Sequence, residues 1–218
     1  MISAALLLAM AVWPFSSGRA SAVEEPEEVL PDEEPSANWS IALNLALLRR
    51  FSEALSKFQA MAEDDPLNPA LHYNIGLAHL EIGDSATAVE SFRRAIELAP
   101  ERADAFTNLG VSLQHLGRLD DACEAYRQAM QLRPNEPAYY YCWGTALLAN
   151  NDPSAAVELL GDAYNADVND PEYCFNFALC LARLDRQDDA RQVFAGFLKL
   201  SRGRYPERET WAQDYISM

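Results

Sequence analysis

The chain has 218 residues, 33 acidic and 17 basic side chains and a formal charge of −16, and half of its residues are apolar. This composition suits a chain that buries a core, either as one large domain or as one repeat array. The negative charge argues against nucleic acid or an anionic membrane surface as the main partner, because both require a basic face.

The first 22 residues are predicted to be a signal peptide or an apolar leader. Ile2–Phe15 is an apolar run of fourteen residues, whereas a helix that crosses a bilayer needs about twenty. Ala20-Ser21-Ala22 fits a signal-peptidase site, although no Lys or Arg precedes the apolar run. Cleavage after Ala22 would place the protein in the periplasm or outside the cell, and an uncleaved leader would leave it in the cytoplasm.

Residues 23–34 are predicted to be a disordered linker. The segment holds seven acidic residues and no basic one, so it cannot bury enough apolar surface to form a core.

The four cysteines contain no CxxC pair, and Cys142 with Cys174 is the one candidate disulfide. The alternative is that all four are small buried apolar residues.

A period of 34 residues runs through the chain from residue 35. One alanine recurs at Ala54, Ala88, Ala122, Ala156 and Ala190. Four residues later the chain has Phe58, Phe92, Tyr126, Leu160 and Phe194. Twelve residues before each alanine it has Ala42, Gly76, Gly110, Gly144 and Ala178. The five ungapped units are 35–68, 69–102, 103–136, 137–170 and 171–204.

Each unit is predicted to hold two amphipathic helices, because its apolar residues recur at helical spacing. The Gly and Ala residues that stand twelve positions before the recurring alanine are expected where two helices approach closely. Gly83 and Gly117 are predicted to end first helices, and Asp152-Pro153 to begin a second helix.

These lanes resemble the tetratricopeptide repeat (TPR), whose signature is W-x2-L-G-x2-Y, then A-x3-F, then P. The resemblance covers residues 35–204 and implies an all-α, right-handed α-solenoid of helix-turn-helix units. Residues 205–218 continue the register as the first helix of a sixth unit. We predict a capping helix there, with Trp211, Ala212 and Tyr215 at the apolar positions of the register and Glu207, Arg208, Glu209 and Asp214 facing water.

The resemblance also implies that the first helices line a concave groove. Position five of the units gives Trp39, Tyr73, Thr107, Tyr141 and Phe175. The aromatic members are predicted to anchor a partner, since large exposed apolar patches mark binding sites. The alternative is that part of this stripe packs against the neighbouring first helix.

Position six carries Asn74, Asn108 and Asn176. An asparagine amide can donate to and accept from a peptide backbone, and the resemblance implies that these residues grip an extended peptide. The alternative is a cap or an inter-helix hydrogen bond. Lys57 and Lys199 are the only lysines and neither lies at a groove position, so the two-lysine clamp of relatives that bind a C-terminal carboxylate is missing. An acidic chaperone tail is therefore a poor candidate ligand.

No pattern of catalytic, cofactor or metal-binding residues is apparent, and we expect no enzyme. His72 and His79 share a helix face about 10 Å apart, and there is no phosphate loop or GxSxG motif. The sequence favours a scaffold that binds an apolar segment of another protein, in envelope or secretion assembly, and self-association is possible. One alternative is a cytoplasmic chaperone, because Asp170–Leu181 resembles the last repeat of type III secretion translocator chaperones. Another is a targeting module for a separate enzyme subunit.

Overall fold

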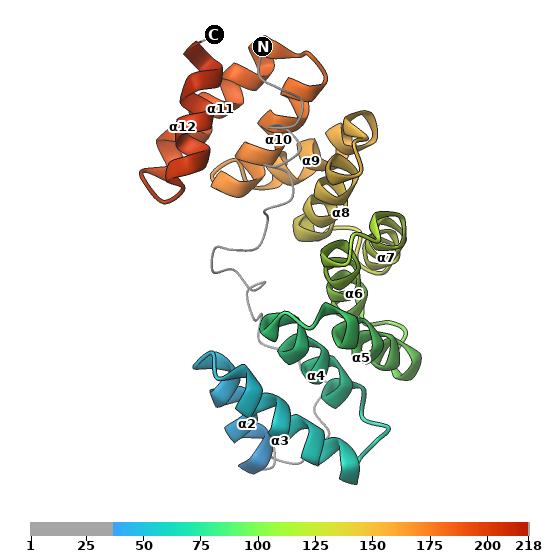
Figure 1. The fold of residues 1–218 in the computed structure, drawn as a ribbon. Coiled ribbons are helices and arrows are strands. Elements are labelled where there is room, and N and C mark those ends of the chain that lie inside the picture. The colour runs from blue at the N-terminus through green and yellow to red at the C-terminus, as the bar shows by residue number, and fades with distance from the viewer. Residues whose placement is uncertain (1–36, 218) are drawn as a thin grey trace. The chain divides into compact units, whose positions relative to one another are not determined.

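The computed structural model describes residues 37–217, so the predicted leader (1–22) and acidic linker (23–34) lie outside the described residues. This part of the chain forms eleven α-helices and contains no strand. The helices are α2 (Ala37–Leu47), α3 (Phe51–Asp64), α4 (Pro69–Ile82), α5 (Ser85–Leu98), α6 (Ala103–His115), α7 (Leu119–Leu132), α8 (Pro137–Ala149), α9 (Pro153–Ala166), α10 (Pro171–Arg183), α11 (Gln187–Ser201) and α12 (Pro206–Ser217), as Figure 1 shows.

The described residues form two compact units that part between Arg133 and Pro134. The first unit (37–133) holds α2–α7, and the second (134–217) holds α8–α12. Within each unit, every helix packs against the next one along the chain. The prediction of an all-α solenoid built from helix-turn-helix pairs is confirmed, and each predicted 34-residue unit contains one such pair.

The glycine lane lies where the two helices of a pair come closest. A Cβ atom added at Gly76 would lie 2.7 Å from the Phe92 ring, and one at Gly110 would lie 2.6 Å from the Tyr126 ring. Both rings are fully buried. In these two pairs the aromatic residue of the second helix therefore fills the space that the glycine of the first helix leaves open.

The first helix of each pair is followed by one residue with positive φ. Gly83 (φ 90°) and Gly117 (φ 72°) fill this position as predicted. Arg49, Asn151 and Asp185 adopt the same left-handed conformation in the other pairs, which the sequence did not reveal because glycine is its usual signal. The predicted start of α9 is confirmed, since the Asp152 carboxylate accepts a hydrogen bond from the Ala155 amide at 3.0 Å.

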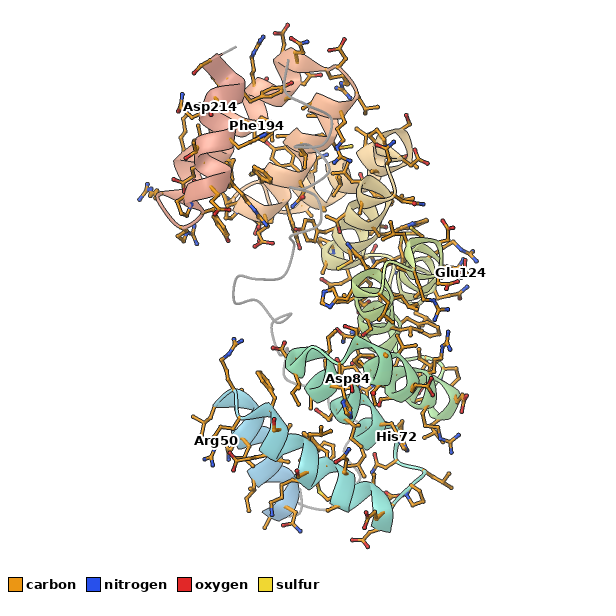
Figure 2. All side chains as sticks on the ribbon, viewed as in Figure 1. Arg50, His72, Asp84, Glu124, Phe194 and Asp214 are labelled. Carbon is orange, nitrogen blue, oxygen red and sulfur yellow. The ribbon has the colours of Figure 1, made fainter. Side chains whose placement is uncertain are left out.

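Helix α12 covers the last pair, as the sixth partial repeat predicts. The Trp211 ring is buried and lies 5.1 Å from the Phe194 ring of α11. Figure 2 shows Phe194 among α10, α11 and α12, with Asp214 on the exposed side of α12. The prediction that Arg208 faces water is wrong, because its guanidinium lies 5.2 Å from the centre of the Phe175 ring.

The predicted candidate disulfide is not formed, because Cys142 and Cys174 are both buried free thiols. Cys180 is also a buried free thiol. Burial raises the pKa of Cys142 and Cys180 to about 12 and that of Cys174 to about 11. These three residues therefore act as small apolar core residues at neutral pH.

Among residues 37–217, no helix has both the length and the hydropathy that a bilayer span requires.

Candidate partner-binding surface

The groove positions predicted for the first helices are two, five, six, nine, twelve and thirteen of each pair. Within each unit, the residues at positions five, six, nine and twelve are what we call the inner row. In the unit 37–133 the inner row is Trp39, Ser40, Leu43, Ala46, Tyr73, Asn74, Leu77, Leu80, Thr107, Asn108, Val111 and Gln114. In the unit 134–217 it is Tyr141, Cys142, Thr145, Leu148, Phe175, Asn176, Leu179 and Ala182.

The inner row of the unit 37–133 is largely accessible. All of its members except Val111 are at least partly exposed, and Leu43 is 38% exposed. Trp39 and Tyr73 each keep one side on the core, where their rings make edge contacts with Phe58 at 5.7 Å and Phe92 at 5.8 Å. Both rings are partly exposed, and their accessible atoms can contact a bound chain.

The inner row of the unit 134–217 is closed, and the prediction of an exposed anchor at Phe175 is wrong. Phe175 has no exposed surface. Its ring lies 5.1 Å from Phe197, 5.7 Å from Phe194 and 6.0 Å from Trp211. Helix α12 supplies two of the groups that surround this ring, Trp211 and Arg208.

Tyr141 and Asn176 are also buried, so the prediction that they stand in an open groove is wrong. They are 7% and 4% exposed. The Tyr141 hydroxyl donates to the Glu172 carboxylate at 3.2 Å, and its ring lies 4.9 Å from the Tyr173 ring. Burial raises the pKa of the Tyr141 hydroxyl well above its ordinary value, and the Glu172 charge adds to this shift. Tyr141 therefore stays neutral over the physiological range.

Two of the predicted backbone clamps instead join neighbouring first helices. Asn108 Nδ2 of α6 donates to the Tyr73 hydroxyl of α4 at 3.0 Å. In the other unit, Asn176 Nδ2 of α10 donates to the Tyr141 hydroxyl of α8 at 2.9 Å. For Asn108 and Asn176, the structure therefore contains the alternative that the sequence left open, an inter-helix hydrogen bond.

Each of these amide groups also donates to its own helix. Asn108 Nδ2 bonds the Asp104 carbonyl, and Asn176 Nδ2 bonds the Glu172 carbonyl, both at 3.1 Å. Asn74 Nδ2 donates to the Ala70 carbonyl at 2.8 Å but makes no bond to a tyrosine, because position five of the preceding pair is Trp39. The amide N–H groups of Asn108 are thus already used in intramolecular hydrogen bonds and do not serve as donors to a bound peptide.

Polar atoms of the accessible inner row remain available for a ligand. The Oδ1 atoms of Asn74 and Asn108 accept no hydrogen bond from any described residue. The Gln114 Oε1 atom accepts from the Tyr126 hydroxyl at 3.1 Å, which leaves its amide N–H groups without an intramolecular partner in residues 37–217. This row can therefore accept from and donate to a peptide backbone.

The structure adds Arg102, which sequence reasoning missed. Its guanidinium lies 4.3 Å from the centre of the Tyr73 ring and binds the Asp104 carboxylate at 2.8 Å. Arg102 is the last residue of its repeat and lies outside the apolar stripes, so periodicity could not single it out. The close Arg-x-Asp spacing was the available signal. Because the two charges cancel, the row around Tyr73 has no net charge.

His72 and His79 make local contacts, whereas His115 Nδ1 lies 3.3 Å from the Ser85 hydroxyl of the preceding helix. His72 Nε2 lies 2.8 Å from the Pro66 carbonyl, and His79 Nδ1 lies 3.3 Å from the Asp84 carboxylate. Residues 37–217 contain no group of three His, Cys, Asp or Glu side chains placed to hold a metal ion.

Comparisons with solved structures show the same fold. MamA from Desulfovibrio magneticus is 22% identical with a TM-score of 0.68, over 78% of this chain and 98% of that one. PilF from Pseudomonas aeruginosa is 19% identical with a TM-score of 0.68, over 82% and 87%. YrrB, described as a TPR protein with an unusual peptide-binding site, is 21% identical with a TM-score of 0.61, over 73% and 89%. No match was found among curated protein sequences.

Family models give the same result at the level of sequence. The tetratricopeptide repeat model matches residues 41–100 and 73–137, and the model of subunit 3 of the anaphase-promoting complex, or cyclosome, matches residues 115–197. The repeat lanes, the helix pairs and these matches agree, and the chain belongs to the tetratricopeptide repeat family.

Proposed function

We propose that this protein is a non-enzymatic scaffold that binds an extended or helical apolar segment of another protein along the inner row of α2, α4 and α6. The observation that carries the proposal is the contrast between the two units. These register positions are at least partly exposed in residues 37–133 except at Val111, and buried in residues 134–217 except at Ala182. In a TPR chain whose apolar row is accessible in just one of its two units, that unit is the place where a partner can bind.

The chemistry of this row suits backbone recognition combined with apolar contacts. Tyr73, Leu77 and Leu80 offer partly exposed apolar surface. Asn108 Oδ1 can accept from a backbone amide, and the Gln114 amide can donate to a backbone carbonyl. The inner row contains no charged residue, and the flanking groove positions of this unit add only two acids, Glu81 and the Arg102-paired Asp104. This sparse charge favours an apolar segment over a strongly charged one. The peptide-binding site named for YrrB supports a peptide ligand for this fold.

The site of action follows from the leader, and we propose envelope or secretion assembly. Cytoplasmic chaperone and targeting-module roles are the alternatives. The apolar run and the Ala20-Ser21-Ala22 pattern support export. N-terminal sequencing of the protein from its native host tests this assignment. A start at Val23 would exclude a cytosolic chaperone, whereas an intact Met1 would contradict export by cleavage.

The binding proposal is tested with peptides selected from a displayed library on the full chain. Leu77→Asp places a charge in the open row and should weaken a selected peptide by at least ~10-fold. Leu132→Asp, at a 41% exposed leucine of the second helix α7, is the matched control and should leave affinity unchanged. Affinity that survives both Leu77→Asp and Asn108→Ala, with helical content intact, would rule out this row.

A further inference from the structure

The inner row of residues 37–133, which we call the open row, is flanked by two acids that differ in how they are paired. Asp104, at the start of α6, binds Arg102 through both of its carboxylate oxygens, at 3.2 and 2.8 Å. Glu81, at the end of α4, makes one ion pair within residues 37–217, a 3.9 Å contact with Arg49. The Arg49 side chain is 73% exposed, and water and salt screen long, exposed pairs of this kind. Glu81 is therefore the flanking acid that can still pair with a ligand.

The first helices of this unit run in parallel, so the open row has two distinct ends. At one end, Asn108 in the first half of α6 bonds Tyr73 in the first half of α4. At the other end, His115 of α6 lies 3.3 Å from Ser85, just beyond the end of α4. The carboxyl termini of α4 and α6 therefore lie together at the Glu81 end, where their last carbonyl groups add partial negative charge.

The other titratable side chains at this end leave the Glu81 charge in place. Arg50 makes two hydrogen bonds, at 2.7 and 2.6 Å, to the carboxylate three residues further along the chain. Burial lowers the pKa of His115 below its ordinary value, so this ring is neutral at pH 7. His79 lies 3.3 Å from a second acid, Asp84. This end of the open row therefore retains negative charge, and the −16 charge of the whole chain adds to its attraction for a cation.

Glu81 directly follows the apolar surface of the open row. Leu77 and Leu80 of α4 are partly exposed, and Glu81 is the next residue, with a side chain that is 32% exposed. The aliphatic stem of a lysine or arginine can cover an exposed leucine while its charged end reaches a carboxylate. A segment that lies on these two leucines therefore brings a neighbouring residue to Glu81.

We propose that the segment bound by the open row carries a lysine or arginine beside its apolar residues, and that this base pairs with Glu81. The inference rests on the proposed function, because it concerns the ligand of the same row. It narrows the partner from any apolar segment to one with a base at a fixed distance from its apolar residues. It also sets the direction in which the segment lies, because only the Glu81 end holds a flanking acid that is not bound by both oxygens to an arginine.

The pairing is tested with the full chain as bait for a displayed library of random peptides. The selected peptides should share a Lys or Arg at a constant spacing from their apolar residues. In the tightest peptide, replacing that base with Gln should weaken binding by ~3–10-fold. Glu81→Gln should weaken the unchanged peptide to the same extent, and should have no further effect on the Gln-containing peptide.

The matched control is Glu97→Gln, at an exposed acid of α5 that is paired with Arg94 at 2.9 Å, and it should leave affinity unchanged. Glu81→Lys should weaken the basic peptide further and restore binding of the peptide in which Glu replaces the base. A loss of packing cannot produce this restoration. Circular dichroism establishes that the variants are folded.

The outcomes separate this inference from the proposed function. Peptides that are weakened by Leu77→Asp but not by Glu81→Gln would lie on the open row without the ion pair, and would overturn the inference alone. Selected peptides that share no base would overturn it as well. Peptides whose affinity survives Leu77→Asp and Asn108→Ala would overturn the proposed function and the inference together.

Discussion

Two regions of the molecule contain the same tyrosine–asparagine hydrogen bond in different surroundings. Tyr73 and Asn108 form it in residues 37–133, where both side chains are partly exposed. Tyr141 and Asn176 form it in residues 134–217, where both are buried. The contrast teaches that the repeat register fixes which helices touch, but not whether the inner row is open to a partner.

The difference comes from residues outside the repeat lanes. In the unit 134–217, Glu172 accepts hydrogen bonds from both Tyr141 and Tyr205, at 3.2 and 3.4 Å. Tyr205 lies in the turn before α12, and Arg208 lies over Phe175. In the unit 37–133 the corresponding acid, Asp104, binds only the nearby Arg102 and the start of its own helix. Arg208 of α12 and Tyr205 of the preceding turn thus cover part of this inner row.

Thiol chemistry should show the largest contrast between the two regions. The thiolate is the reactive form, so a thiol whose pKa is raised to about 12, as in Cys142, reacts at pH 8 at least ~10³-fold more slowly than an ordinary thiol. Cys123 of the unit 37–133 is only partly buried. Mass spectrometry of the alkylated native chain should therefore find label on Cys123 first, and on all four cysteines after denaturation. Rapid native labelling of Cys142 or Cys180 would contradict the burial of this region.

Replacing the aromatic residue at position five with alanine should lower the free energy of unfolding more in the closed row of residues 134–217 than in the open row of residues 37–133. Phe175→Ala removes a fully buried ring and should lower the free energy of unfolding by ~3–5 kcal/mol. Tyr73→Ala should cost roughly half as much, because Tyr73 is already partly exposed and the buried surface lost is smaller. Urea unfolding of the two variants measures both. Equal losses would show that the rows are equally buried in solution.

Packing between the two helices of a pair should, in contrast, be the same in both regions. Gly110→Ala and Gly144→Ala each place a Cβ atom within 2.7 Å of a buried side chain and should each cost ~1–3 kcal/mol. Gly196→Ala is the control, because nothing lies within 4 Å of its added Cβ. It should stabilise α11 by up to ~1 kcal/mol. If only one of the two lane glycines is sensitive, the helix pairs are not equivalent.

The smallest contrast concerns the tyrosine hydroxyls. Tyr141→Phe removes the hydroxyl that accepts from buried Asn176 and donates to Glu172, and should cost ~1–3 kcal/mol. Tyr73→Phe should cost less than ~1 kcal/mol, since water can reach the partly exposed Asn108 amide. Denaturation midpoints compare the two, and a Tyr73→Phe loss as large as that of Tyr141→Phe would contradict the difference in exposure.

The sequence correctly predicted features that depend on contacts between one helix and the next along the chain. The Gly110–Tyr126 contact, the cap at Asp152 and the inward position of Trp211 all follow from spacing, because each depends on one helix and the next. Exposure at Phe175 could not be predicted in this way. The Phe175 ring is contacted by Arg208 and Trp211, which belong to no complete repeat, and a guanidinium such as that of Arg208 is usual on surfaces.

The role of the asparagines shows a second limit. The residue type at position six predicts only that an amide is present, and an amide has donors and an acceptor that can serve different partners. Which group Asn108 or Asn176 uses depends on whether the preceding pair places a tyrosine hydroxyl within reach. That requires the distance between α4 and α6, or between α8 and α10, which no single repeat contains.

Hydroxyl-radical footprinting of the full chain, free and with a library-selected peptide, tests most directly whether the recognition row lies in residues 37–133. We expect Tyr73 and Leu77 to be oxidised readily in the free chain and protected by the peptide, while Phe175 and Leu179 stay unreactive throughout. Oxidation of Phe175 at the rate of Tyr73, or peptide protection confined to residues 134–217, would contradict this account.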